Sequence, residues 1–185
     1  VAGKGMSAAL LMAHLAAATR ICLASSPNLT DAVRHLNGLL LNSMMDDRFI
    51  TFVVAVLDLE QFRLTIINAG HLPPLLRRGN RNPVQIEDVA ADAAGLPLGV
   101  HDCSYRQVEI TLEPGDTLLL YTDGVTEARN VSGELYDMER LRAAMVQAPG
   151  DAAGMVNSLL SELQEFSQSR LAGDDVTILC LGRIA

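Results

Sequence analysis

The sequence lacks any run of five or more lysine and arginine residues, and it contains a single lysine, Lys4. Its formal net charge is −8 at pH 7. Nonspecific binding to nucleic acid and adhesion to anionic lipid both require a basic surface. We therefore expect neither nucleic acid nor a charged lipid surface among its partners.

Paired cysteines are also missing. Cys22, Cys103 and Cys180 are odd in number, lie far apart and form no CxxC pair. This pattern excludes a disulfide framework and a zinc ligand set, and it is typical of a reducing compartment. We expect a cytoplasmic protein whose three cysteines pack in its core.

The sequence has no clean hydrophobic run of membrane-spanning length. The apolar stretch from Ala8 to Ala24 contains His14 and Arg20, and it falls short of the roughly 20 apolar residues that a spanning helix needs. Neither a basic segment nor a cleavage site of a signal peptide accompanies it. We expect a buried helix and no membrane insertion.

The composition of the sequence is that of a globular protein, with 49% hydrophobic and 19% charged residues. A length of 185 residues suits a single domain over residues 1–185. The chain starts at Val1, inside a glycine-rich stretch and without an initiator methionine. We interpret it as a fragment that is incomplete at its N-terminus.

The order of expected elements is helices, hairpin-linked strands, helices and a final strand, which indicates the α+β class with mostly antiparallel sheets. The alternation of Val108, Ile110 and Leu112 with polar residues predicts a strand with one exposed face. The expected helices are 6–23, 30–45, 138–147 and 152–169, and Thr30 is the expected N-cap of the second. The expected strands are 49–59, 62–68, 105–112, 117–121 and 176–182. The first and the last of these strands are expected to be buried.

Two aspartates lie beside glycine at the ends of predicted strands. Asp123 follows TLLLY and precedes Gly124, and Asp174 follows Gly173 and precedes VTILCL. A carboxylate in this place is held by a rigid scaffold and faces open space, as a site for Mg²⁺ or Mn²⁺ requires. The same residues also dominate ordinary turns and strand ends, so local chemistry alone leaves both interpretations open.

Five segments in order resemble the SpoIIE/RsbU-type phosphatases, the bacterial branch of the 2C-type metal-dependent protein phosphatases. They are VAGKGMSAALLMA, NAGHLPPLL, GLPLGV, LLLYTDGVTEA and GDDVTILCL. The resemblance covers essentially the whole chain. It implies two packed antiparallel sheets flanked by helices, an αββα sandwich that here lacks its first strands.

The resemblance also implies a site. Asp123, Asp174 and the backbone carbonyl of Val1 would bind two divalent cations, Mn²⁺ or Mg²⁺, which requires Asp123 and Asp174 to converge in space. A metal-activated water, rather than a protein nucleophile, would hydrolyse the phosphate ester. Residues expected to support this site are Gly3, Gly5, Gly124 and His71. A direct catalytic role for His71 is the less favoured alternative.

The implied function is hydrolysis of phosphoserine or phosphothreonine on a regulatory protein, such as an anti-sigma-factor antagonist of the STAS fold. An upstream sensor or receiver domain in the parent chain would control it through the first two helices. The family's first metal-binding aspartate would come just before Val1, so we expect the 185-residue fragment itself to be inactive. The alternative is a non-catalytic partner-binding module on the same fold.

Overall fold

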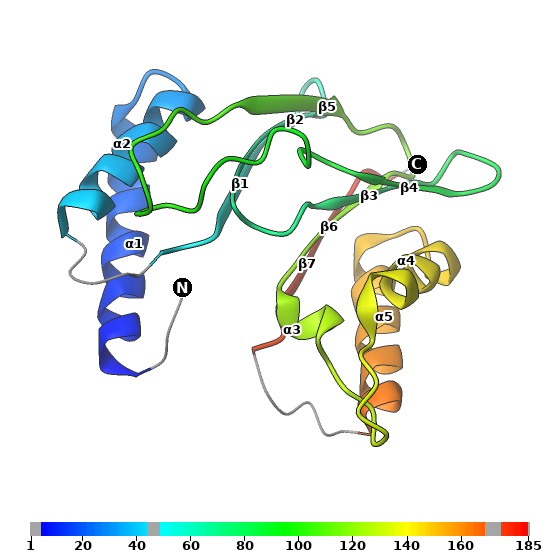
Figure 1. Cartoon of the computed structure of the whole chain (residues 1–185). Helices are drawn as coiled ribbons and strands as arrows, with labels where there is room; N and C mark the ends of the chain where they lie inside the picture. The colour runs from blue at the N-terminus through cyan, green and yellow to red at the C-terminus, as the bar shows by residue number, and fades with distance from the viewer. Residues whose placement is uncertain (1–4, 44–48, 169–174, 185) are drawn as a thin grey trace. The chain divides into compact units, whose positions relative to one another are not determined.

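The computed structural model describes residues 5–43, 49–168 and 175–184. It forms two compact units, whose elements are labelled in Figure 1. The first unit comprises Val1–Leu59, Arg63–His71 and Ala90–Ile110, and the second comprises Glu60–Phe62, Leu72–Val89 and Thr111–Ala185. That the two units together make up one domain over residues 1–185 stays a prediction.

The first unit begins with two helices, α1 (Met6–Ser25) and α2 (Leu29–Ser43). The Ala, Leu and Met content of α1 favours helix because these residues lose little side-chain entropy there. The cap of α2 differs from the prediction: the Asn28 side chain, not that of Thr30, accepts a hydrogen bond from the backbone N–H of Asp31 at 2.8 Å. Asparagine is as strong an N-cap as threonine or stronger, so the helix starts earlier.

Helix α1 is buried on one face only. Ala8, Leu15, Ala18 and Cys22 are buried, whereas Leu10 is 65% exposed. By length and composition, α1 is the one helix in the described part of the chain that could cross a membrane, with 22% of its apolar window buried. The prediction of a buried helix therefore holds for one of its faces.

A three-stranded sheet completes the first unit in the order β1-β2-β5. Strands β1 (Phe52–Asp58) and β2 (Arg63–Ala69) form an antiparallel hairpin, and β5 spans Gln107–Thr111. The predicted burial of β1 on both faces is wrong, because β1 lies at the sheet edge and Val56 is 48% exposed. The central strand β2 is the buried one.

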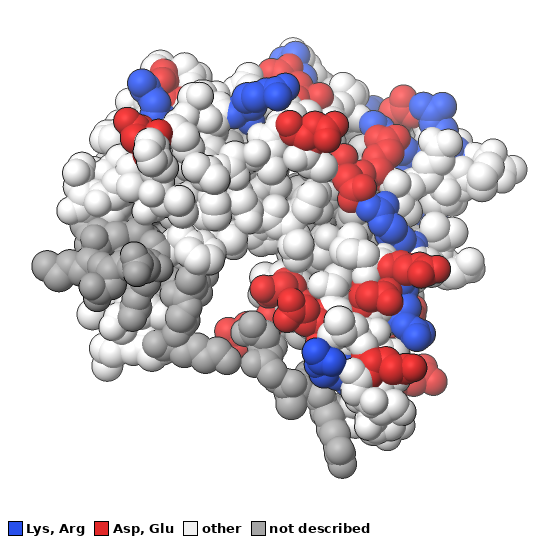
Figure 2. All heavy atoms as spheres, in the orientation of Figure 1, with Lys and Arg blue, Asp and Glu red and all other residues white. Residues whose placement is uncertain are grey.

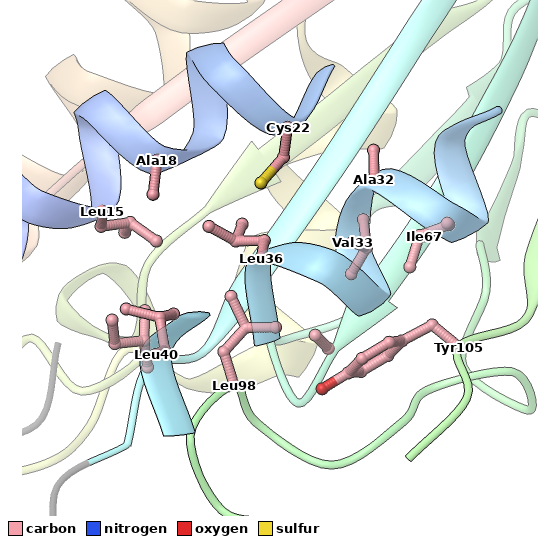
Figure 3. Packing of buried hydrophobic residues seen from close by; sticks show 12 residues of the cluster. Leu15, Ala18, Cys22, Ala32, Val33, Leu36, Leu40, Ile67, Leu98 and Tyr105 are labelled. Atoms are coloured by element: carbon pink, nitrogen blue, oxygen red, sulfur yellow. The ribbon is translucent and has the colours of Figure 1, made fainter. Parts of the chain in front are cut away.

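The core of the first unit lies where α1 and α2 pack together and against this sheet. Figure 3 shows Cys22 and Leu15 of α1 pointing toward Leu36 of α2, and Leu98 and Tyr105 contributing from the loop before β5. Cys22 is buried, as predicted, and its burial raises the pKa of the thiol. Free thiols in such surroundings behave as small apolar side chains.

The second unit is built on a four-stranded antiparallel sheet in the order β4-β3-β6-β7. Its strands are β3 (Leu75–Arg78), β4 (Gln85–Asp88), β6 (Thr117–Tyr121) and β7 (Ile178–Gly182). Three helices accompany them, namely α3 (Asp123–Thr126), α4 (Asp137–Gln147) and α5 (Ala152–Ser167). The core of this unit includes Leu119, Leu141, Met155 and Leu159.

Three features of the second unit were predicted wrongly. No strand was expected between residues 68 and 105, yet β3 and β4 form there and pair with each other. The short helix α3 was not predicted either. Strand β7 was expected to be buried, yet it lies at the edge of the sheet and Leu179 is 50% exposed. The α+β class with two antiparallel sheets and flanking helices is confirmed.

Charged side chains of both signs are mixed on the face that Figure 2 shows, with arginines next to acidic residues. In one ion pair the acidic partner is fully buried. Asp116 is 0% exposed, and its carboxylate accepts a hydrogen bond from Arg78 at 2.7 Å. The same carboxylate accepts hydrogen bonds from the backbone N–H groups of Gly79 and Glu113. These bonds hold the β3–β4 turn against the turn before β6.

We expect Asp116→Ala to lower the free energy of unfolding by about 3–5 kcal/mol, because it leaves the Arg78 guanidinium without its buried partner. Asp88→Ala, which breaks the more exposed Arg142 pair, should cost less than about 1 kcal/mol. Urea unfolding of both variants checks this. Equal losses for the two substitutions would contradict the ranking.

Candidate metal centre

Asp123 lies two residues after the end of β6, at the first residue of α3. Its side chain is exposed, and Oδ1 accepts a hydrogen bond from the backbone N–H of Gly124 at 3.0 Å. Its backbone carbonyl accepts hydrogen bonds from the Thr126 hydroxyl and the Glu127 N–H. The buried strand and these local bonds fix the backbone of Asp123 while its carboxylate faces outward.

The pairing of β6 with β7 brings a second acidic residue to this place. Tyr121 and Ile178 are the last partners of the ladder, so the next residues, Thr122 and Thr177, come opposite each other. The backbone N–H of Thr122 donates to the carbonyl of Thr177 at 3.1 Å. Asp175 lies two residues before Thr177, and its carbonyl accepts a hydrogen bond from the Thr122 hydroxyl at 2.9 Å.

Gly124 is packed directly beneath this incoming segment. A Cβ atom at Gly124 would lie 2.5 Å from the carbonyl oxygen of Asp175 and 3.0 Å from its carbon. Real Cβ atoms do not approach a backbone that closely, so position 124 requires glycine for a steric reason. The close approach brings Asp175 next to the residue that follows Asp123.

Of the predicted site residues, Asp123 and Gly124 are the ones that the structure places beside the backbone of Asp175. Asp174, Val1 and Gly3 lie outside the described residues. The convergence of Asp123 and Asp174 stays a prediction.

Gly5 and His71 belong to the first unit. Gly5 precedes α1 with φ of 89°. The backbone N–H of His71 donates to the Asn68 side chain, and the Asn68 amide donates back to the His71 carbonyl. Gly70, with φ of 71°, would place a Cβ 2.5 Å from the ring of Pro97, so glycine is required in this turn. The supporting role of Gly5 and His71 stays a prediction.

Thr122 and Asp175 were missed in the sequence analysis. Their signal was present, because TLLLYTDG and DDVTILC each carry a threonine at the end of an apolar strand. Antiparallel pairing of the two strands in this register puts Thr122 opposite Thr177. The register, and with it the hydrogen bonds of Thr122, could not be derived from one strand alone.

Tyr121 lies next to the site but is unsuited to proton transfer near neutral pH. Its side chain is buried, and burial, followed by the nearby charge of Asp88, raises the pKa of Tyr121 to about 12. The phenol therefore stays protonated, and its hydroxyl contacts the sulfur of Met138 at 3.2 Å. This assigns Tyr121 to packing of the second unit.

The oxygen atoms at this place suit a hard cation. Carboxylate and carbonyl oxygens are the protein ligands that Mg²⁺ and Mn²⁺ prefer, and Asp123 presents an exposed carboxylate on a fixed backbone. The space above Gly124 admits the backbone of Asp175 only because no side chain fills it. Among the described residues, no group of three His, Cys, Asp or Glu side chains gathers at one point.

Comparison with known proteins identifies the family. The model of the family described as Stage II sporulation protein E (SpoIIE) matches residues 1–184. The chain is 28% identical over 184 residues to the phosphoserine phosphatase RsbU of Bacillus subtilis, covering 99% of this chain and 53% of RsbU. The chain thus spans about half the length of this relative.

Solved structures share the fold. The RsbU and RsbW domains of Rv1364c from Mycobacterium tuberculosis match with a TM-score of 0.74 and 26% identity, over 100% of this chain and 50% of that one. The SiaA-PP2C domain of Pseudomonas aeruginosa matches with a TM-score of 0.79 and 20% identity, over 98% and 72% of the two chains. With a family match over nearly its whole length, the chain belongs to the SpoIIE family.

Proposed function

We propose that this chain is the catalytic part of a metal-dependent phosphatase that hydrolyses phosphoserine or phosphothreonine on a regulatory protein. The observation that carries the proposal is the packing of the Asp175 segment over Thr122 and Gly124, beside the exposed carboxylate of Asp123. It places the TDG motif beside the backbone of Asp175, although these residues lie far apart in the sequence. Family membership and the name of RsbU as a phosphoserine phosphatase support the same conclusion.

The proposed cofactors are two divalent cations, Mn²⁺ or Mg²⁺. Asp123 would hold a cation through its carboxylate, with Asp174 and the Val1 carbonyl as the further ligands that the resemblance implies. Magnesium is named for the solved structure of RsbX, which shares the fold with a TM-score of 0.63 and 17% identity, over 97% of this chain and 75% of that one. When bound, such cations activate the attacking water and neutralise the phosphate.

The roles of the chain's own residues follow from their places. The Thr126 hydroxyl and the Glu127 N–H hold the backbone carbonyl of Asp123, and the Gly124 N–H donates to its carboxylate. Gly124 leaves room for the opposing backbone. Preorganised charge of this kind is the main means by which phosphoryl transfer is accelerated, since the reaction needs positioning and electrostatic stabilisation more than covalent chemistry.

The proposed substrate is a phosphorylated regulator of the STAS fold, and the proposed control comes from a sensor or receiver domain elsewhere in the parent protein. Cytoplasmic location is part of the same proposal. It is supported by the cysteines, since Cys22, Cys103 and Cys180 are all free and pack against the two cores.

The test is phosphate release by the full-length protein from a phosphoserine regulator of the STAS fold. We expect turnover with Mn²⁺ or Mg²⁺ and loss of turnover with excess EDTA, restored by adding the cation back. Binding of the phosphorylated regulator without phosphate release, at any concentration of either cation, would favour the partner-binding module instead.

A further inference from the structure

Thr122 makes more hydrogen bonds to the opposing segment 175–177 than strand pairing alone provides. Strand pairing alone accounts for its backbone N–H, which donates to the Thr177 carbonyl at 3.1 Å. Its hydroxyl adds two bonds: it accepts from the Thr177 N–H at 2.9 Å and donates to the Asp175 carbonyl at 2.9 Å. One side chain therefore satisfies both a donor and an acceptor of the opposing backbone.

These bonds act beyond the point where the β6–β7 ladder ends, at Tyr121 and Ile178. The Thr122 hydroxyl bonds the opposing backbone as a strand partner would, and it extends the hydrogen-bonded pairing to Asp175. There the Asp175 carbonyl accepts a hydrogen bond from the Thr122 hydroxyl, and it lies so close to Gly124 that a Cβ atom at position 124 would be 2.5 Å from its oxygen. The two contacts are independent of each other, because one is polar and the other steric.

We infer that Thr122 is a positioning residue that sets the distance between Asp123 and the acidic segment at Asp175. This inference rests on the proposed function, since it assigns Thr122 to the same cation site. Thr122 precedes Asp123 directly, so its backbone and its side chain tie both acidic segments to one residue. Side chains that orient metal ligands typically change metal affinity by 10–100-fold when they are replaced.

Valine has nearly the shape of threonine but no hydroxyl. Thr122→Val keeps the strand propensity and the volume, while the Thr177 N–H and the Asp175 carbonyl lose a partner. The segment at Asp175 then loses one of its two restraints, and the ligand geometry beside Asp123 loosens. Serine keeps the hydroxyl, so Thr122→Ser preserves both bonds.

The experiment uses the full-length protein with Thr122→Val, Thr122→Ser and, as a matched control, Thr111→Val, which removes an exposed strand hydroxyl of β5. Mn²⁺ affinity is measured by calorimetric titration, independently of catalysis. We expect Thr122→Val to weaken Mn²⁺ binding by about tenfold or more, with the KM for the phosphorylated regulator unchanged at saturating Mn²⁺. Thr122→Ser and Thr111→Val should bind Mn²⁺ as the parent protein does.

Amide hydrogen exchange gives a second measurement that does not depend on metal. The Thr177 amide should exchange faster in Thr122→Val and stay protected in Thr122→Ser. Unchanged Mn²⁺ affinity in a folded Thr122→Val, or equal weakening by valine and serine, overturns the inference even if the parent protein hydrolyses its substrate. An inactive parent protein whose Mn²⁺ binding still requires the hydroxyl overturns the proposed phosphatase activity and leaves the positioning role standing.

Discussion

Asp123→Asn in the full-length protein is expected to lower Mn²⁺-dependent phosphate release by about a thousandfold, because a lost ligand removes several kcal/mol of transition-state stabilisation. The substitution keeps the size of the side chain and the acceptor that Gly124 uses, so the fold should persist. What it removes is the negative charge that a hard cation needs. The measurement is phosphate release at several Mn²⁺ concentrations, with circular dichroism to verify folding.

The control for this prediction is Glu165→Gln, which removes an exposed carboxylate from α5 in the same unit. It should leave turnover unchanged, and it corrects for the general effect of one negative charge fewer. Retention of full activity by a folded Asp123→Asn would refute the assignment of Asp123. Because the family resemblance implies Asp174 as a further ligand, we expect the same loss for Asp174→Asn.

Gly124→Ala is expected to lower turnover by about a hundredfold, the size of effect that a displacement near 1 Å has on a reaction that depends on alignment. The added Cβ would lie 2.5 Å from the Asp175 carbonyl oxygen, and the neighbour is backbone rather than a flexible side chain. Either α3 or the Asp175 segment has to move, and overpacking of this kind also costs about 1–3 kcal/mol of stability. Turnover and thermal unfolding are measured together.

Gly38→Ala is the matched control for adding a methyl group at a glycine. Gly38 lies inside α2, and a Cβ there meets nothing within 4 Å. Alanine should therefore raise the free energy of unfolding by roughly 0.5–1 kcal/mol, because glycine is the poorer helix former. A Gly124→Ala variant that is as active and as stable as the parent would show that the Asp175 segment does not depend on this contact.

Strands with strong local signals could be predicted from the sequence in both units. The apolar run TLLLY gave β6, and the alternation from Tyr105 to Leu112 gave β5. The bond from Arg78 to the buried Asp116 was not predicted, since it joins segments that are far apart in the chain. Local composition does not reveal such partners.

The errors have physical reasons of the same kind. Strand β1 is rich in β-branched residues and β7 in apolar ones, which predicted burial, yet both lie at sheet edges. Edge position depends on the order of strands rather than on composition. Strand β4 is short and its QIED sequence is weakly apolar, so only pairing with β3 reveals it.

The candidate site was predicted in part. Asp123 was identified by its place after a strand and before a glycine, a signal strengthened by the family resemblance. Thr122 was not predicted, because its hydrogen bonds depend on which residue faces it across the β6–β7 pair. Gly124 was predicted to support the site, and this role stays a prediction; the structure shows that a Cβ atom at position 124 would collide with the Asp175 carbonyl.

The most direct measurement is a crystal structure of the full-length protein soaked in Mn²⁺, read through its anomalous difference map. Placement of a cation at the end of β6 predicts a manganese peak about 2.1 Å from a carboxylate oxygen of Asp123, beside the Asp175 segment, and its disappearance in Asp123→Asn. A well-ordered Asp123 with no peak beside it, or manganese bound only elsewhere in the molecule, would contradict the account.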